Sequence, residues 1–370
     1  MLKILFFLMI VLSSCSDYVD LFLYEKEDKF NAYITRLDQK KFTENVVKGS
    51  LPIAIKDNID VKGFANTAGS LALKDNYPEK NAFLVQKLVD NDFFVSGKAN
   101  LSEWANFRST SSTSGWSSMG GQTMNPYGTN RNPCGSSSGS AVAVASGMVK
   151  MAIGTETNGS ISCPASINGV VGIKPTVGLV SRSGIIPISD TQDTAGPIAN
   201  NVYNAAKVLE VISGYDPNDP ATNDIPEDFD FGFTRDLDST ALTNVRVALL
   251  DVAKKNEKGK ILYDKAKEIL KKCGAEVVEV EDSRKYPGAS ERMVLLYEFK
   301  IGLEKYLSTA NTSQKTLDDL INFNNENADQ VLKFFDQSRF IDSYEIADRA
   351  IDYEEALKEV LSSKEMIDNM

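Results

Sequence analysis

The chain of 370 residues contains no histidine. This absence excludes the Ser-His-Asp triad, the HExxH zinc site and every other site that depends on an imidazole ring. Basic residues are also in deficit, because 40 lysines and arginines face 51 acidic residues and give a formal net charge of -11. Phosphate binding needs a concentrated basic surface, so we expect no nucleic-acid partner.

Long apolar runs are scarce, and the one notable run lies at the N-terminus. Lys3 precedes an apolar stretch, residues 4–12, that is too short to span a bilayer and is typical of an export signal. The letters LSSC, ending at Cys15, resemble a bacterial lipobox, in which the cysteine becomes the lipidated first residue. We therefore predict a signal peptide over residues 1–14 and an exported lipoprotein anchored to a membrane, on its periplasmic or extracellular face. The alternative is an ordinary secretory signal with a chance cysteine.

Cysteine is rare as well. Beyond Cys15 the chain has only Cys134, Cys163 and Cys273, an odd number without metal-ligand spacing. We therefore expect small packing residues rather than a disulfide framework, and no metal site.

Strand-like and helix-like segments alternate along the rest of the chain, which is typical of an α/β domain. The stretch LPIAIKDNIDVKG reads as a strand, with Ile53 and Ile55 alternating ahead of Lys56. Further strands are predicted at residues 93–95, 151–154, 245–250 and 276–280, and helices at 79–91, 140–149, 260–273, 291–307, 315–336 and 341–369. One α/β domain over residues 16–370 is the favoured architecture.

The segment NPCGSSSGSAVAVASGMVKMAIGTETNGSISCPAS, which begins at residue 132, is crowded with serines that could act as nucleophiles. Without histidine, the base that activates one of them must be a carboxylate, a tyrosine, a terminal amine or a lysine made neutral by burial. Lys56 is a candidate because it directly follows an apolar strand, although a surface lysine at a strand end is the simpler interpretation. Serines of this segment also cap helices or build turns, and Ser162 and Ser166 compete with Ser160 for the role of nucleophile.

Backbone donors for an oxyanion are available beside Ser160. Thr157, Asn158 and Gly159 immediately precede it, and glycine lets the backbone approach a reacting carbonyl closely. We therefore predict an oxyanion hole from the amides of residues 157–160.

Several motifs between Lys56 and Pro197 resemble the amidase signature family, and most closely its peptide amidase branch. Ser136 and Ser160 stand 24 residues apart, as do the serines of that family's two signature turns. The matching stretches, in family order, are AIKDN, GKANLSEWANFRS, GGQTMNPYGTNRNPCGSSSGS, GTETNGSISCPAS, NGVVGIKPTVGLVSRSGIIPIS and QDTAGPIA.

The resemblance implies a Ser-Ser-Lys triad in which Ser160 is the nucleophile, Ser136 the bridging serine and Lys56 the base. It also implies a supporting role for Ser137, a cis peptide before Ser136, and a central mixed β-sheet flanked by helices on both faces. The signature region covers about residues 51–200. The expected activity is amide hydrolysis through an acyl-enzyme, with release of ammonia or an amine and without a metal or organic cofactor.

The chain departs from the family pattern in length and in one loop. Family members continue beyond the position of Met370, so the resemblance implies that the C-terminal part of the domain is missing. Cys134 and Ser138 replace two glycines of the serine loop, where their side chains would narrow the approach to Ser136.

Carboxamides, including C-terminal peptide amides, are the expected substrates, and no obligate protein partner is expected. A long polar loop over residues 109–132 is predicted to be ordered, with Phe107, Ser109 and Trp116 contacting substrate. The alternative is that the two aromatic side chains pack this loop against the core. Two other functions stay open: an inactive, truncated surface lipoprotein, and an amidotransferase of the A type that passes ammonia to a charged transfer RNA together with partner proteins.

Overall fold

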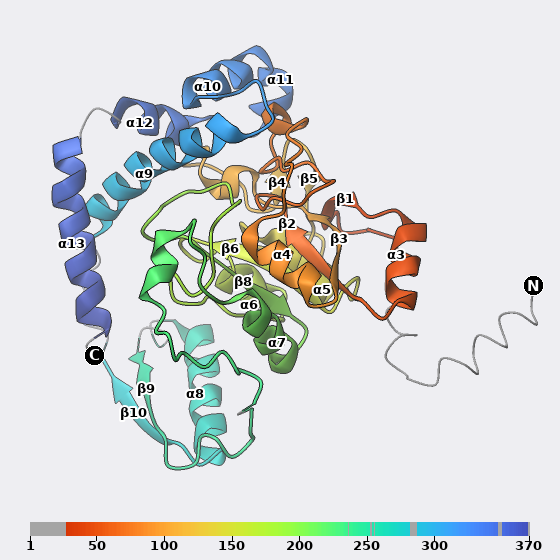
Figure 1. The fold of residues 1–370 in the computed structure, drawn as a ribbon. Helices are drawn as coiled ribbons and strands as arrows, with labels where there is room; N and C mark the ends of the chain where they lie inside the picture. Colours follow the sequence, from red (N-terminus) through yellow and green to blue (C-terminus); the bar gives the residue numbers. More distant parts are fainter. Residues whose placement is uncertain are drawn as a thin grey trace, which may run out of the picture. The chain divides into compact units, whose positions relative to one another are not determined.

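The computed structural model describes residues 27–235, 237–251, 254, 256–281, 287–346 and 350–368 (Figure 1). The predicted signal peptide and Cys15 lie outside these residues. Over the described ranges, no helix has the length and apolar character needed to cross a membrane.

The chain forms two compact units. The larger unit takes the described residues up to Phe231 together with Met293–Ala350, and the smaller one takes Gly232–Arg292 and the residues from Ile351 onward. Every residue of the predicted site belongs to the larger unit. The predicted division into a signal peptide and one domain stays a prediction.

A six-stranded mixed sheet, in the order β1-β3-β2-β6-β8-β7, forms the centre of the larger unit. The strands are β1 (Tyr33–Arg36), β2 (Leu51–Lys56), β3 (Phe93–Ala99), β6 (Met151–Glu156), β7 (Val171–Gly172) and β8 (Thr194–Ala199). β2 runs parallel to both β3 and β6, whereas the β1–β3, β6–β8 and β7–β8 pairs are antiparallel. The two parallel strands β2 and β6 therefore bring their carboxyl ends to the same edge of the sheet, where α/β proteins commonly place their sites.

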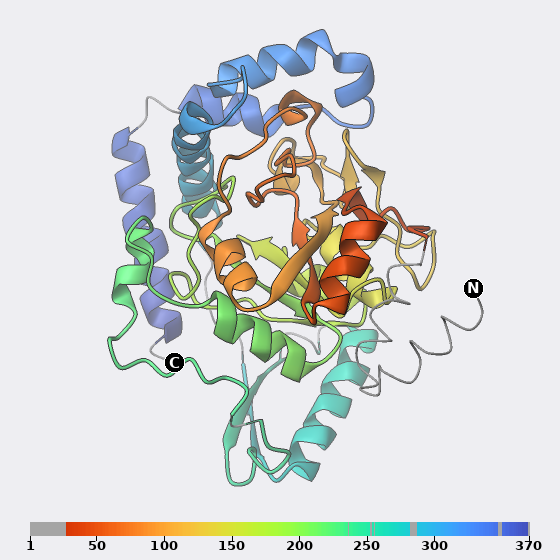
Figure 2. The ribbon, with the colours of Figure 1, turned by 45° about the vertical axis from the view of Figure 1, so that its right-hand side comes forward.

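Helices cover the sheet in two groups, as expected (Figures 1 and 2). α4 (Phe83–Asp90) packs with α7 (Val202–Ile212) and contacts β3, while α7 contacts β8. α5 (Ser138–Ala145) packs with α6 (Ser162–Ile167) and contacts β2, β6 and β8. Small side chains allow α5 to approach closely, because its buried Ala141 and Ala143 meet Ala54 and Ala152 of the strands in one apolar cluster.

A third helical group follows in the chain and packs on the loops beside the sheet. It consists of α9 (Gly288–Thr309), of which the part from Met293 onward belongs to the larger unit, with α10 (Leu317–Glu326), α11 (Ala328–Val331) and α12 (Ser338–Ile346). Phe299 and Leu303 of α9 share a buried cluster with Trp104 and Ile186 from the loops. These helices therefore cover chain segments that connect the strands.

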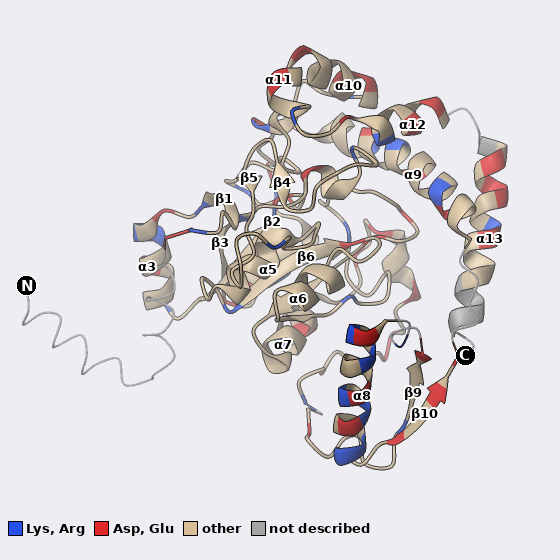
Figure 3. Cartoon of the chain, turned by 180° about the vertical axis from the view of Figure 1, so that it is seen from behind, with Lys and Arg blue, Asp and Glu red and all other residues tan. Residues whose placement is uncertain are grey.

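The smaller unit contains a strand-helix-strand motif. β9 (Arg246–Leu250) and β10 (Glu276–Val280) pair in parallel and are joined by α8 (Glu257–Lys272). Asn256 caps the start of α8, and Gly274 adopts a left-handed conformation just after its end, at φ 86°. Charges of both signs are spaced along α8 (Figure 3). From Ile351 onward α13 (Ala350–Asp368) also belongs to this unit.

Predicted helices and strands agree with the structure where the hydrophobic periodicity is strong, and they differ where tertiary contacts determine the secondary structure. β1, β7 and β8 were not predicted, and β8 contains Gly196 and Pro197, which rarely occur inside a central strand. The single helix predicted over residues 315–336 is divided at Asn327, where α10 ends and α11 begins.

Candidate active site

Lys56 is the last residue of β2 and is fully buried. Its Nζ lies 2.8 Å from the Oγ of Ser136, 2.7 Å from the Oγ1 of Thr155 and 3.2 Å from the carbonyl oxygen of Thr155. Thr155 lies near the end of β6, which runs parallel to β2 in a register that pairs Ile55 with Ile153. The strand register therefore brings a threonine that was not singled out from the sequence against the buried amine.

Burial lowers the pKa of Lys56 from 10.5 to about 7, although the negative charges of Asp193 and Glu156 oppose this change. Removing an ammonium from water disfavours its charged form. Close to pH 7, a substantial fraction of Lys56 is therefore a neutral amine that can accept a proton.

The hydrogen-bond partners of Lys56 fit both of its protonation states. Asn58 donates from Nδ2 to the Thr155 Oγ1 at 3.1 Å. Lys56 donates to the same Oγ1 and to the carbonyl oxygen of Thr155. When the neutral amine of Lys56 donates to both Thr155 oxygens, its lone pair can still accept a hydrogen bond. Among the described residues, the Ser136 hydroxyl is its remaining hydrogen-bond partner and can donate to this lone pair. When the amine is protonated, the Ser136 oxygen accepts the third N–H. The geometry thus allows a proton to move between Ser136 and Lys56.

Ser136 and Ser137 lie directly before α5, and the Gly135–Ser136 peptide is cis, as the family resemblance implied. The carbonyl of Ser136 accepts a hydrogen bond from the Ser102 amide at 3.1 Å. Ser137 connects β6 with the turn that carries Ser160. Its hydroxyl donates to the Thr155 carbonyl and accepts from the Thr155 amide, and its own amide donates to the carbonyl oxygen of Ser160 at 3.1 Å. Ser137 therefore holds the serine loop against β6 and against the turn that carries Ser160.

The turn around Ser160 is organised by the carboxylate of Glu156, which was not identified from the sequence. Glu156 accepts hydrogen bonds from the amides of Gly159 at 2.9 Å, Ile161 at 2.7 Å and Ser162 at 2.8 Å. Gly159 lies at φ 87°, a conformation that glycine adopts without steric cost. The chain therefore reverses sharply just before Ser160 and enters α6.

Ser160 is the most accessible of the three predicted triad residues, at 8% exposure against 0% for the other two. Among the hydrogen bonds of the described residues, none joins the hydroxyls of Ser136 and Ser160. The amide of Gly159, one of four predicted oxyanion donors, already donates to Glu156. Thr157 directs its hydroxyl to Asp193, and Asn158 is exposed. The roles of these residues stay predictions.

Cys134 and Cys163 form a disulfide, which corrects the expectation that both are isolated packing residues. Their Cα atoms lie 6.0 Å apart although 29 positions separate them in the sequence. The bond joins the segment before Ser136 to α6, which follows Ser160. Cys273, half-buried, has a free thiol. Ser138 donates its hydroxyl to the Cys134 carbonyl, and the expected narrowing of the approach to Ser136 by these two side chains stays a prediction.

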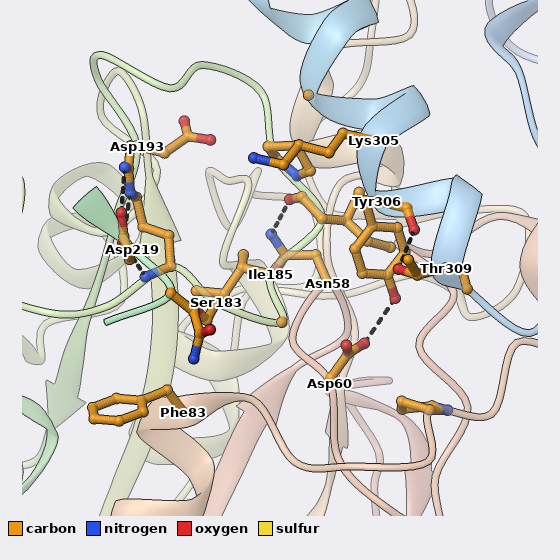
Figure 4. A pocket seen from close by; sticks show the side chains of 18 of the residues that line it. Asn58, Asp60, Phe83, Ser183, Ile185, Asp193, Asp219, Lys305, Tyr306 and Thr309 are labelled. Carbon is orange, nitrogen blue, oxygen red and sulfur yellow. Dashed lines mark hydrogen bonds and ion pairs between the residues drawn. The ribbon is translucent and has the colours of Figure 1, made fainter. Parts of the chain in front are cut away.

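A cavity of about 1350 Å³ lies at the carboxyl edge of β2 and β6 (Figure 4). Thr155, Thr157, Asn58 and Asp193 line it on the side of the predicted triad. Its other walls come from residues 76–86, which include the start of α4, from the loops at 182–190 and 216–220, and from residues 302–311 at and just after the end of α9. The cavity therefore offers space for an extended ligand next to the Lys56 network.

Charged side chains in this cavity are mostly committed to partners. Arg182 binds Asp219 through Nη2 at 2.6 Å and Nε at 3.0 Å, and its Nη2 lies 3.3 Å from Asp190. Tyr306 of α9 donates to Asp60 at 2.7 Å, as Figure 4 shows. Burial raises the pKa of Asp193, while bonds from Thr157 and from backbone amides oppose that change. These contacts fix the cavity walls before any ligand arrives.

The three residues predicted to contact substrate do not line this cavity. Phe107 packs on Phe299 of α9, with 4.8 Å between ring centroids, and Ser109 donates its hydroxyl to Asp336. Trp116 packs edge-on against two phenylalanines, Phe334 and Phe335. The two aromatic side chains thus make the packing contacts of the alternative interpretation, and contact with substrate stays a prediction.

The profile of the Amidase family matches residues 27–366. The chain belongs to the amidase signature family. A probable amidase of Arabidopsis thaliana is 40% identical over 305 residues, which are 79% of this chain and 58% of the plant protein. This chain therefore spans less than two thirds of the length of that relative.

Solved structures place the fold near peptide amidase. The native peptide amidase from Stenotrophomonas maltophilia is 43% identical, with a TM-score of 0.86 over 93% of this chain and 75% of that enzyme. A Glutamyl-tRNA(Gln) amidotransferase protein from Thermotoga maritima is 30% identical, with a TM-score of 0.63 over 94% of this chain and 73% of that protein. This chain is therefore more similar in sequence and structure to the peptide amidase than to the amidotransferase.

Proposed function

We propose that this protein hydrolyses carboxamides, including C-terminal peptide amides, through an acyl-enzyme on Ser160. The observation that carries the proposal is the contact between a fully buried Lys56, whose pKa is about 7, and the hydroxyl of Ser136. A lysine in this state can act as the base in a chain without histidine. The family membership and the spacing of the two serines support the same function.

In the proposed reaction, Ser160 attacks the amide carbonyl carbon while its proton passes to Ser136 and the Ser136 proton passes to Lys56. The C–N bond then breaks, and the proton held by Lys56 returns through Ser136 to the departing nitrogen. Ammonia leaves and Ser160 carries the acyl group as an ester. Water repeats the attack by the same proton path and releases the carboxylic acid. Backbone amides of residues 157–160, other than the Gly159 amide that already donates to Glu156, are proposed to stabilise the oxyanion in both steps.

Peptide amides are the proposed substrate class because of the size of the cavity and because of the relatives. The volume of about 1350 Å³ exceeds what a small aliphatic amide would fill. The similar solved enzyme from Stenotrophomonas maltophilia is named a peptide amidase. Peptide residues on the acyl side of the amide would extend from Ser160 along the walls formed by Arg182 and Tyr306.

The experiment is reaction of the folded protein with a fluorophosphonate, followed by intact mass measurement, in parallel with Ser160→Ala and Ser162→Ala. One adduct is expected in the parent and in Ser162→Ala, and none in Ser160→Ala. Release of ammonia from a dipeptide amide should follow the same order. A folded parent that neither binds the reagent nor releases ammonia would reject hydrolysis and favour an inactive surface protein.

We also propose that the protein is exported and anchored through a lipid on Cys15. The export signal and the LSSC motif are the basis of this proposal. The Cys134–Cys163 disulfide supports it, since disulfides persist mainly in oxidising compartments. Cys15→Ser should remove the acyl mass from the mature protein and release it from membranes; a parent without acyl groups would reject the anchor.

A further inference from the structure

A covalent bond joins the two segments that carry the proposed catalytic serines. Cys134 lies two residues before Ser136, and Cys163 lies three residues after Ser160 in the first turn of α6. Both cysteines are half-buried. Neither lines the cavity beside Lys56. The disulfide is thus close to both serines along the chain and, like the two serines themselves, lies outside the cavity lining.

The separation of the two serines depends on their backbones. Among the described residues no hydrogen bond joins their hydroxyls, so their side chains do not fix each other. Besides the packing of α5 on α6, two hydrogen bonds cross between the segments among the described residues: the Ser137 amide donates to the Ser160 carbonyl at 3.1 Å, and Asn168 donates to the Pro133 carbonyl at 2.8 Å. The disulfide is a third link between them, and it is covalent.

The conformation of Cys134 adds a reason for a tether at this point. Cys134 lies at φ 58°, in the left-handed region that residues with a β-carbon seldom adopt. Its amide donates to the side-chain oxygen of Asn132 at 2.7 Å, and its carbonyl accepts the Ser138 hydroxyl. The bond to Cys163 is a third constraint on this turn, two residues before the serine that contacts Lys56.

We propose that the Cys134–Cys163 disulfide is a positioning element for catalysis: it holds the Ser136 segment against the Ser160 segment, and its reduction lowers kcat without raising KM. The inference rests on the proposed hydrolysis. Small errors in the placement of reacting groups have large effects on rate, so we expect kcat to fall about tenfold or more. KM should stay within about twofold of the parent, because the cavity walls are untouched.

Reduction needs an external dithiol, and dithiothreitol is the probe. One of its thiolates attacks a sulfur of the disulfide and forms a mixed disulfide, releasing the other cysteine as a thiolate. The second thiol of the reagent then displaces the remaining cysteine and closes a cyclic disulfide. The protein gains two electrons and two protons, and the reagent loses the same. Alkylation with iodoacetamide should then add two more adducts than in the oxidised protein.

The test compares oxidised and reduced full-length parent with two double variants and one control. Cys134→Gly with Cys163→Ala removes the bond but places glycine at the left-handed position, whereas Cys134→Ser with Cys163→Ser removes only the bond. Both double variants should have the low kcat of the reduced parent, and dithiothreitol should not change it. Cys273→Ser should keep the kcat of the parent and its full response. A parent kcat in the glycine pair would overturn the proposal, because the link would then be dispensable.

Hydrogen–deuterium exchange of the parent separates this inference from the proposed function. Reduction should speed exchange in residues 133–140 and 157–165 and leave the central strands unchanged. If the oxidised parent does not hydrolyse amides, the proposed function fails, and the exchange data alone decide whether the bond positions the segments. Unchanged exchange there, or a rise across the whole sheet, would overturn the positioning role.

Discussion

Two lysines lie fully buried on neighbouring parallel strands, and they differ in their partners. Lys98 of β3 forms an ion pair with Asp57 at 3.2 Å and donates to the carbonyl oxygens of Ile59 at 2.6 Å and Ala65 at 3.2 Å. Lys56 of β2 contacts only hydroxyl and carbonyl oxygens of Ser136 and Thr155 among the described residues. The Lys98 amine is thus paired with a carboxylate, whereas the Lys56 amine contacts a serine hydroxyl.

The difference shows that burial alone does not make a base. Burial lowers the pKa of both lysines, and for Lys98 the contact with Asp57 opposes that change. An ammonium paired with a carboxylate and two carbonyls has its three donors satisfied and no neighbour that needs a base. A hydroxyl partner is what allows Lys56 to exchange a proton. Lys98 is therefore a structural ion pair, and Lys56 is the proposed base.

Replacing Lys56 should have the largest effect on activity. Lys56→Met keeps most of the side-chain volume and removes the base, so kcat/KM should fall by about 10²–10⁴-fold, as measured by ammonia release from a peptide amide. Between pH 7 and 10.5 the unfolded chain binds more protons at this lysine than the folded one, so the penalty for burying it is greatest below pH 7. The variant should therefore be at least as stable as the parent at pH 6. Full activity would remove Lys56 from the mechanism.

Replacing Lys98 should affect stability instead. Lys98→Met leaves Asp57 buried without its partner, which typically costs about 3–5 kcal/mol in the free energy of unfolding. Urea unfolding measures this loss, and fluorophosphonate titration counts the folded sites. The kcat per folded site should stay near that of the parent, and adding Asp57→Asn should recover part of the stability. A folded Lys98→Met protein without activity would contradict the division between the two lysines.

Replacing Thr155 should give the smallest of these effects. Thr155→Val removes the Oγ1 that orients the Lys56 amine, and kcat should fall about tenfold at constant KM. Ser140→Ala is the matched control, because Ser140 donates to the Ile153 carbonyl at 2.9 Å and is also buried, without a contact to Lys56. Equal kcat values for the two variants would show that Thr155 does not position the base.

Local patterns predicted part of this arrangement. The alternation around Ile53 and Ile55 indicated the strand that ends at Lys56, and the residues around α8 indicated the strand-helix-strand motif of the smaller unit. The family resemblance supplied the pairing of Lys56 with Ser136, which the 2.8 Å contact agrees with. These features depend on periodicity and motif spacing, which a single sequence carries.

Other features depend on three-dimensional neighbours, and the sequence did not indicate them. Thr155 meets Lys56 through strand register, and Glu156 organises the Ser160 turn through bonds to three backbone amides. Cys134 and Cys163 come together only when both serine segments are folded. Phe334 and Phe335, the partners of Trp116, lie far along the chain and could not be named from the sequence.

The central claim is that Lys56 acts as a neutral base, and the most direct test is the pH dependence of the fluorophosphonate reaction rate. In the parent, the rate constant should rise with pH through a single titration with a midpoint near pH 7, because the neutral fraction of Lys56 grows there. In Lys56→Met this titration should be absent. A rate that is independent of pH in the parent, or the same midpoint in the variant, would contradict the account.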